Sequence, residues 1–230
     1  MVTGVSECSQ QRGNLKDNGY RLIQKYTEVI MSLLTLHTIT TTPEKSKKLL
    51  QSSINDFGWI PNQSGYMSES PSLLAAYQRA HDLFIDSSLN EEEKAVVWIT
   101  TGIENGCNYT VQAHAYIAIH NGVDKKTVKA LIEKTNDLSP RLLALREFTI
   151  EVIYCRGQLK RDAIDLFLNR GFSKQNMLDV VLGVSQKNMS TILNSIAGTE
   201  IDDKFKLDDL YPMDFKMHRD SKGANPRKHR

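Results

Sequence analysis

The sequence predicts an all-α protein, and two observations carry this prediction. Helix start and stop signals recur along most of the chain, and alternating β-branched runs bounded by hairpin turns are missing apart from a short threonine-rich stretch at Leu36–Thr42. The 230 residues are 40% hydrophobic and 24% charged, which is an ordinary globular mixture. A chain of this length can bury a substantial hydrophobic core.

Boundary residues divide the chain into successive helices. The signals are residues that commonly cap helix N-termini and glycines that commonly follow helix C-termini. Asn90 and Glu93 have the spacing of a capping box, and Asn105-Gly106 predicts a break between two neighbouring helices. In order, the expected helices cover residues 42–57, a segment from Pro71, residues 90–103, 107–120, a short segment from Asp124, and residues 139–156, 161–169 and 174–196.

The last expected helix carries an apolar pattern. Residues three and four apart share one face of a helix, so apolar residues at that spacing predict a face turned to the core. We therefore expect a core helix. The members of this pattern are Met177, Val180, Val181, Val184, Met189 and Ile192.

Charge and hydropathy argue against two classes of partner. A formal net charge of +2 is too small to draw in nucleic acid or an anionic membrane through the field of the whole molecule. No stretch approaches the roughly 20 apolar residues that a membrane-spanning helix requires. The tail from Lys216 to Arg230 is basic and almost free of apolar residues, and we expect a flexible tail rather than a binding arm. We expect no nucleic-acid partner and no membrane partner.

The cysteines favour a reducing compartment. Cys8, Cys107 and Cys155 are few, odd in number and widely spaced, which is not the pattern of a disulfide framework. The first residues show no apolar run after a basic start, so no secretory signal is expected. The cytoplasm is the expected location.

One helix combines residue types that can do chemistry. Glu104, Cys107, Thr110 and His114 follow one another at spacings of three, three and four residues, so on a continuous helix they would share a face. If the chain breaks at Asn105-Gly106, Cys107 lies at a helix start, where the helix dipole lowers the pKa of a thiol. The alternative is a small buried cysteine, a helical threonine and a core histidine, which spacing alone favours.

The residues around this helix resemble a known family. The run Leu89-Asn-Glu-Glu-Glu, then Val96-Val97-Trp98, then Glu104-Asn-Gly-Cys-Asn-Tyr-Thr-Val-Gln-Ala-His114 is similar to the central signature of the alkylhydroperoxidase D/carboxymuconolactone decarboxylase superfamily. The resemblance implies an alkylhydroperoxidase D-like helical fold with a central helix that bears the cysteine. It also implies that residues 36–205 form the domain, with an N-terminal extension at 1–35 and a basic tail at 206–230.

Two departures from the family pattern bear on its chemistry. The second cysteine of the family's Cys-x-x-Cys corresponds to Thr110, so no dithiol can form within the helix. The glutamate that the family carries eleven residues before the first cysteine corresponds to Ala95. Some relatives instead resemble this chain in having a glutamate at the place of Glu104, which is why Glu104 stays a candidate.

Three functions are compatible with the resemblance. The first is an antioxidant peroxidase in which Cys107 attacks a peroxide, His114, Glu104 and Thr110 assist, and an external thiol is the reductant. The second is a decarboxylase-type enzyme in which His114 acts on a small carboxylated substrate held by Lys187, although an ordinary solvated position is the simpler account of Lys187. The third is a non-catalytic member that binds a small ligand or partner.

The resemblance implies a homo-oligomer, a trimer or a hexamer. No cofactor is expected, because the chain has no glycine-rich phosphate loop. No metal is expected either, because His37, His81 and His120 have no second ligand at the spacing of a recognisable zinc pattern. Cys155 lies among apolar residues and is expected to pack rather than to resolve a sulfenic acid.

Overall fold

The computed structural model describes residues 34–207, and within this range it contains helices and no strands. The all-α prediction is thereby confirmed. The expectations for most of the N-terminal extension and for the basic tail from Lys216 concern residues that lie outside the described range, as does Cys8. Of the described helices, none is long and apolar enough to span a bilayer.

The helices begin and end close to the boundaries that their capping residues predict. Asn90 and Glu93 form the predicted capping box, and Ser70 and Ser139 accept hydrogen bonds from the first turns of their helices. The elements are η1 (Glu44–Ser46), α3 (Lys47–Phe57), α4 (Asn62–Met67), α5 (Pro71–Ile85), α6 (Glu91–Glu104), α7 (Asn108–His120), α8 (Lys125–Ile132), α9 (Pro140–Cys155), α10 (Arg161–Asn169), α11 (Lys174–Ala197) and η2 (Asp203–Phe205).

The hairpin of α6 and α7 is the centre of the fold. Every residue of α6 from Glu93 to Ile103 is buried, and α6 packs against α7, α8, α9 and α11. Gly102 lets the two helices approach closely, because a Cβ at this position would lie 2.9 Å from Thr110 Cγ2 and 3.2 Å from the backbone nitrogen of Val111. The hairpin therefore fixes α7, and with it the predicted site residues, against the core.

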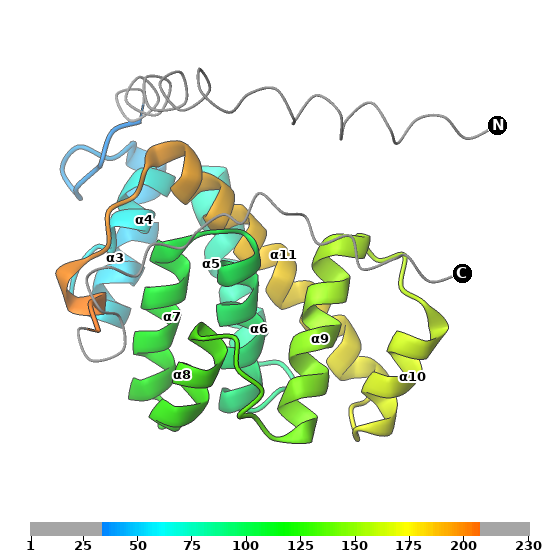
Figure 1. Cartoon of the computed structure of the whole chain (residues 1–230). Helices are drawn as coiled ribbons and strands as arrows, with labels where there is room; N and C mark the ends of the chain where they lie inside the picture. The colour runs from blue at the N-terminus through cyan, green and yellow to red at the C-terminus, as the bar shows by residue number, and fades with distance from the viewer. Residues whose placement is uncertain (1–33, 208–230) are drawn as a thin grey trace, which may run out of the picture.

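The remaining helices surround this hairpin (Figure 1). On one side, α9 packs against α6 and α10 packs against α9; on the other, α3, α4 and α5 pack against one another. The long α11 contacts α4, α5, α6, α7 and α9, so it links the two sides. This arrangement brings α5, α7 and α11 together although they are far apart in the sequence.

Two details differ from the sequence-based expectations. The short helix α4, which follows Pro61, was not predicted, because six residues carry too little periodicity to reveal a helix. On α11, Val180 and Val184 face the core as expected, but Val181 is 44% exposed and Ile192 is 61% exposed. The apolar pattern of α11 therefore covers two faces, and one of them is turned to solvent.

The segment after α11 returns to α7 and is fixed there by Asp202. One carboxylate oxygen of Asp202 accepts a hydrogen bond from Trp59 Nε1 at 3.1 Å, and the other accepts one from the Tyr109 hydroxyl at 2.7 Å. The backbone nitrogen of Asn62 also donates to this carboxylate. Phe205, three residues later, is thereby packed against Tyr109 and Trp59.

Candidate functional site

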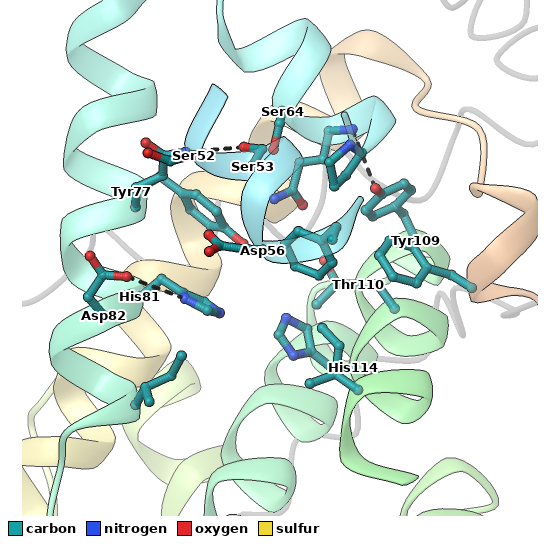
Figure 2. Close-up of a pocket in the computed structure, with 18 residues that line it drawn as sticks. Ser52, Ser53, Asp56, Ser64, Tyr77, His81, Asp82, Tyr109, Thr110 and His114 are labelled. Atoms are coloured by element: carbon teal, nitrogen blue, oxygen red, sulfur yellow. Dashed lines mark hydrogen bonds and ion pairs between the residues drawn. The ribbon is translucent and has the colours of Figure 1, made fainter. Parts of the chain in front are cut away.

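A cavity of about 600 Å³ lies between α3, α5 and α7 (Figure 2). Tyr77, His81 and Asp82 reach it from α5, and Thr110 and His114 reach it from α7. His81 and His114 approach it from opposite walls, as Figure 2 shows. The volume falls within the range of small-molecule sites in proteins.

His114 joins the cavity to a buried lysine on α11. Its Nε2 atom is in hydrogen-bond contact with Nζ of Lys187, and the same Nζ donates to the Tyr77 hydroxyl at 3.2 Å. Lys187 is completely buried, so the expectation of a solvated lysine is wrong. It lies between two aromatic rings, with Nζ 5.1 Å from the Trp98 centroid and 5.3 Å from the Tyr77 centroid. Helix α11 must bury this face to link both halves of the fold.

Burial shifts the protonation of this cluster toward uncharged forms. Desolvation, with the nearby positive charges of Lys187 and His81, lowers the pKa of His114 well below 6.5. Desolvation, with the charge of Lys187, also lowers the pKa of His81 to about 3. Desolvation lowers the pKa of Lys187 itself, although Tyr77 and Cys107 oppose this shift. Both imidazoles are therefore neutral at physiological pH.

His114 has one ring nitrogen without a partner. Its Nδ1 atom is buried and has no hydrogen-bond partner among the described residues, whereas Nε2 is engaged by Lys187. A buried polar atom without a partner costs roughly 1–3 kcal/mol. Since the side chain also lines the cavity, Nδ1 is an atom that a bound molecule can satisfy.

Cys107 occupies the predicted helix start but is shielded from solvent. The break at Asn105-Gly106 is present, Gly106 has a φ of 65°, and Cys107 is the N-cap residue of α7. The thiol donates to the Thr110 hydroxyl at 3.2 Å, and the Asn194 amide donates to the sulfur at 3.7 Å. Cys107 is 5% exposed and lies behind Thr110 rather than in the cavity wall.

Glu104 is not brought together with the other predicted site residues. It is the last residue of α6, so the break at Asn105-Gly106 separates it from Cys107, Thr110 and His114. Its carboxylate accepts a hydrogen bond from the Tyr154 hydroxyl of α9 at 2.7 Å. This contact raises the pKa of Tyr154 to about 12.

The side chains of opposite charge are unequally represented in the cavity lining. Two carboxylates, Asp56 and Asp82, line it, and no lysine or arginine is among its lining residues. Lys187 lies behind the wall formed by Tyr77 and His114, so it does not face an incoming carboxylate directly. Among the described residues, no group of three or more histidine, cysteine, aspartate or glutamate side chains is arranged to hold a metal ion.

Sequence reasoning missed part of this site. It singled out His114 but did not predict that Lys187 would bridge His114 and Tyr77. Lys187 lies 73 residues after His114, and Tyr77 lies 37 residues before it. His81 was considered as a metal ligand, whereas here its ring stacks on Trp98 with 4° between the planes. One signal in the sequence was available. Lys187 follows Val180 and Val184 at helical spacing, so the buried face that these two valines define could have predicted that Lys187 is buried as well.

The central part of the chain matches a known protein family. The model of the carboxymuconolactone decarboxylase family matches residues 71–148, which include α5, α6 and α7. The predicted resemblance is confirmed. The segment that matches this family carries Cys107, Thr110 and His114, whereas Lys187 on α11 lies outside it. Among curated proteins, none matches the chain significantly.

Several solved structures share the fold of this chain. A peroxidase-related protein with an alkylhydroperoxidase D core from Ralstonia eutropha JMP134 is 19% identical, with a TM-score of 0.65 over 74% of this chain and 92% of its own. A peroxidase-related protein from Silicibacter sp. TM1040 is 16% identical, with a TM-score of 0.64 over 75% and 92% of the two chains. The debrominase Bmp8 bound to 2,3,4-tribromopyrrole is 15% identical, with a TM-score of 0.64 over 75% and 93%.

Proposed function

We propose that this chain is an enzyme that binds a small organic molecule in the cavity and activates an oxygen atom of that molecule through His114. The observation that carries the proposal is the buried, unpartnered Nδ1 atom of His114, a residue that lines the cavity. We assign the donor role in the contact between Nζ of Lys187 and Nε2 to the lysine, and this assignment places the ring proton on Nδ1. His114 therefore offers an N–H donor to a ligand oxygen.

The lowered pKa of His114 decides which role this side chain takes. An imidazole whose pKa lies well below 6.5 is a poor base at neutral pH, but it remains a good hydrogen-bond donor. A neutral imidazole can polarise a carbonyl group and stabilise the negative charge that develops on its oxygen. We expect proton transfer at the carbon next to such a carbonyl, with the amine of Lys187 as the nearest basic group.

A hydrogen–deuterium exchange experiment tests this proposal without knowledge of the natural substrate. A panel of small aldehydes and ketones is incubated with the protein in deuterated water, and exchange at the carbon next to the carbonyl is followed by NMR. We expect accelerated exchange for at least one compound, and a loss of about a hundredfold in His114→Gln, since removal of one such donor typically has an effect of this size. The matched control is His120→Gln, an exposed histidine on the same helix. A His114→Gln rate equal to that of the control would contradict the proposal.

A thiol peroxidase is the second candidate, and the environment of Cys107 favours it. The sulfur is hydrogen-bonded to Thr110, which lines the cavity, and receives the Asn194 amide. In this mechanism the thiolate attacks the O–O bond, takes one oxygen as a sulfenic acid and releases water or an alcohol, and an external thiol then reduces the sulfenic acid. We assign no role to Glu104 in this mechanism, because its carboxylate accepts a hydrogen bond from Tyr154 on α9.

Peroxide consumption tests the second candidate. The rate with hydrogen peroxide and with an organic hydroperoxide is measured in the presence of a thiol reductant, for the wild-type protein and for Cys107→Ser. Cys155→Ser is the matched control, since its sulfur donates a hydrogen bond to Glu151 on α9. A rate that does not exceed that of free cysteine, or one that survives in Cys107→Ser, removes the peroxidase candidate.

A further inference from the structure

Lys187 is unusual among the described lysines because its ammonium group is buried without a carboxylate. Its hydrogen-bond contacts within residues 34–207 are the Tyr77 hydroxyl and Nε2 of His114, and neither of these groups is a carboxylate. Burial of an ammonium ion without a compensating anion is strongly unfavourable, so the surroundings favour the free amine. A free amine is a nucleophile.

Lys94 provides a comparison within the same molecule. Its side chain is also largely buried, at 9% exposure, but Nζ lies 2.9 Å from a carboxylate oxygen of Glu91. This carboxylate is a counter-charge of the kind that Lys187 lacks among the described residues. The two buried lysines therefore differ in the feature that determines nucleophilicity.

The position of Lys187 relative to the cavity suits a reaction there. Its Nζ lies directly behind two groups that line the cavity, the Tyr77 hydroxyl and the His114 ring. The reaction therefore requires rotation about the terminal bonds of the lysine side chain, so that the amine passes between these two groups. The same two groups can carry protons to and from the reacting atoms.

We propose that the amine of Lys187 forms an imine with an uncharged aldehyde or ketone bound in the cavity. The inference rests on the proposed function and names its substrate class. The amine attacks the carbonyl carbon, so a C–N bond forms and the carbonyl π electrons move to oxygen, which receives the hydrogen bond of His114 Nδ1–H. The resulting carbinolamine loses its oxygen as water. The two protons that leave the nitrogen end on this water, relayed by Tyr77 and His114, and no oxidant or reductant takes part.

The two carboxylates in the cavity lining favour an uncharged carbonyl compound over an anionic one. Asp56 and Asp82 line the cavity, and no lysine or arginine lines it to balance them. A carboxylated substrate would meet like charges as it enters, whereas an uncharged one would not. This feature argues against the small carboxylated substrate of the decarboxylase-type alternative.

Reductive trapping tests the inference. The wild-type protein is incubated with benzaldehyde and sodium cyanoborohydride, and benzylated lysines are located by peptide mass spectrometry. We expect one benzyl group at Lys187, formed at least about tenfold faster than at Lys129, whose side chain is 59% exposed, because each unit by which a pKa falls raises the amine fraction about tenfold. Lys94 should stay unlabelled, and Lys187→Met should lose the label.

A matched pair of aldehydes tests the charge requirement. 4-Carboxybenzaldehyde should label Lys187 at least about tenfold more slowly than benzaldehyde does, while the two compounds label Lys129 at similar rates. Labelling that follows solvent exposure, with Lys187 unmodified, overturns the inference, as does equal labelling of Lys187 by both aldehydes.

A binding measurement separates this inference from the proposed function. Benzyl alcohol, which cannot form an imine, is titrated into the wild-type protein by calorimetry. Binding of benzyl alcohol without labelling of Lys187 overturns the imine and leaves the cavity's function standing. If benzyl alcohol does not bind and Lys187 is not labelled, the imine and the proposed function are both overturned.

Discussion

At the scale of single residues, the contact between His114 and Lys187 determines the chemistry of the site. Each of these two side chains is titratable, and neither has a carboxylate partner among the described residues. Their neighbour His81 shares this environment, because it stacks on Trp98, which also contacts the His114 ring. Protonation of the cluster therefore places positive charges close together in a poorly solvated region.

This cluster predicts a loss of stability in acid. The folded-state pKa values of His81 and His114 lie below 6.5, so the unfolded chain binds more protons in the window beneath that value. The contribution of the two uncharged histidines to the free energy of unfolding is fully present above about pH 6.5. It is lost as the pH falls, and for His81 the loss continues down to about pH 3. We expect the free energy of unfolding to fall by up to about 1.4 kcal/mol per pH unit for each group.

Urea unfolding across this pH range measures the effect. In His114→Gln, the free energy of unfolding should depend less steeply on pH, because the contribution of His114 is lost. His120→Gln, which changes an exposed histidine on the same helix, should leave this slope as in the wild type. An identical slope in wild type and His114→Gln would show that His114 is already protonated in the folded state.

A second prediction at this scale concerns Thr110. Thr110→Cys puts a thiol where a hydroxyl now lies 3.2 Å from the sulfur of Cys107. We expect a disulfide on oxidation and a gain of peroxide consumption with an external thiol, because a neighbouring thiol rescues a sulfenic acid. Thr110→Ser, which keeps the hydroxyl, should show no gain. Peroxide consumption in Thr110→Cys no faster than in wild type would contradict the prediction.

At the scale of elements, the α6–α7 hairpin is positioned by the missing side chain of Gly102. A methyl group there would meet Thr110 Cγ2 at 2.9 Å and Val111 Cγ2 at 3.0 Å. Gly102→Ala should therefore destabilise the fold by about 1–3 kcal/mol, the usual cost of overpacking.

A double-mutant cycle identifies the cause of this cost. Thr110→Ser removes the methyl group that the new Cβ would meet, so it should recover part of the loss when combined with Gly102→Ala. Full recovery is not expected, because Val111 stays in place. Chemical unfolding of the two single variants and the double variant gives the coupling, and strictly additive losses would exclude crowding at Thr110.

The helices could be predicted from the sequence because their signals are local. The capping box of Asn90 and Glu93 lies within four residues, and Gly58, Gly122 and Gly198 have the positive φ values of helix ends. The cavity could not be predicted in this way. Lys187 meets Tyr77 and His114 through packing of three helices, and spacing along one helix carries no information about such a contact.

At the scale of the whole molecule, the family resemblance implies a homo-oligomer, and α11 offers a face for it. Four apolar side chains lie on one side of this helix at multiples of the helical turn and are 65, 44, 61 and 47% exposed. These residues are Leu178, Val181, Ile192 and Ile196. We propose that this face, defined by the four residues, contacts a second copy of the chain.

Charged substitutions on this face test the oligomer. Leu178→Lys combined with Ile192→Lys should lower the molar mass measured by light scattering after size exclusion. Leu166→Lys is the matched control, since Leu166 is 50% exposed and belongs to another helix, α10. A monomeric wild-type protein would contradict the prediction outright.

The anchor at Asp202 ties the end of the described chain to the site. This one carboxylate receives Trp59, Asn62 and Tyr109, and the segment it fixes presses Phe205 against the same aromatic group that surrounds Cys107. Removal of that carboxylate, as in Asp202→Ala, would release Trp59, Asn62 and Tyr109 together. The thiol would then become accessible to alkylating reagents, and the cavity would lose a wall, so reactivity toward iodoacetamide and ligand affinity should change in opposite directions.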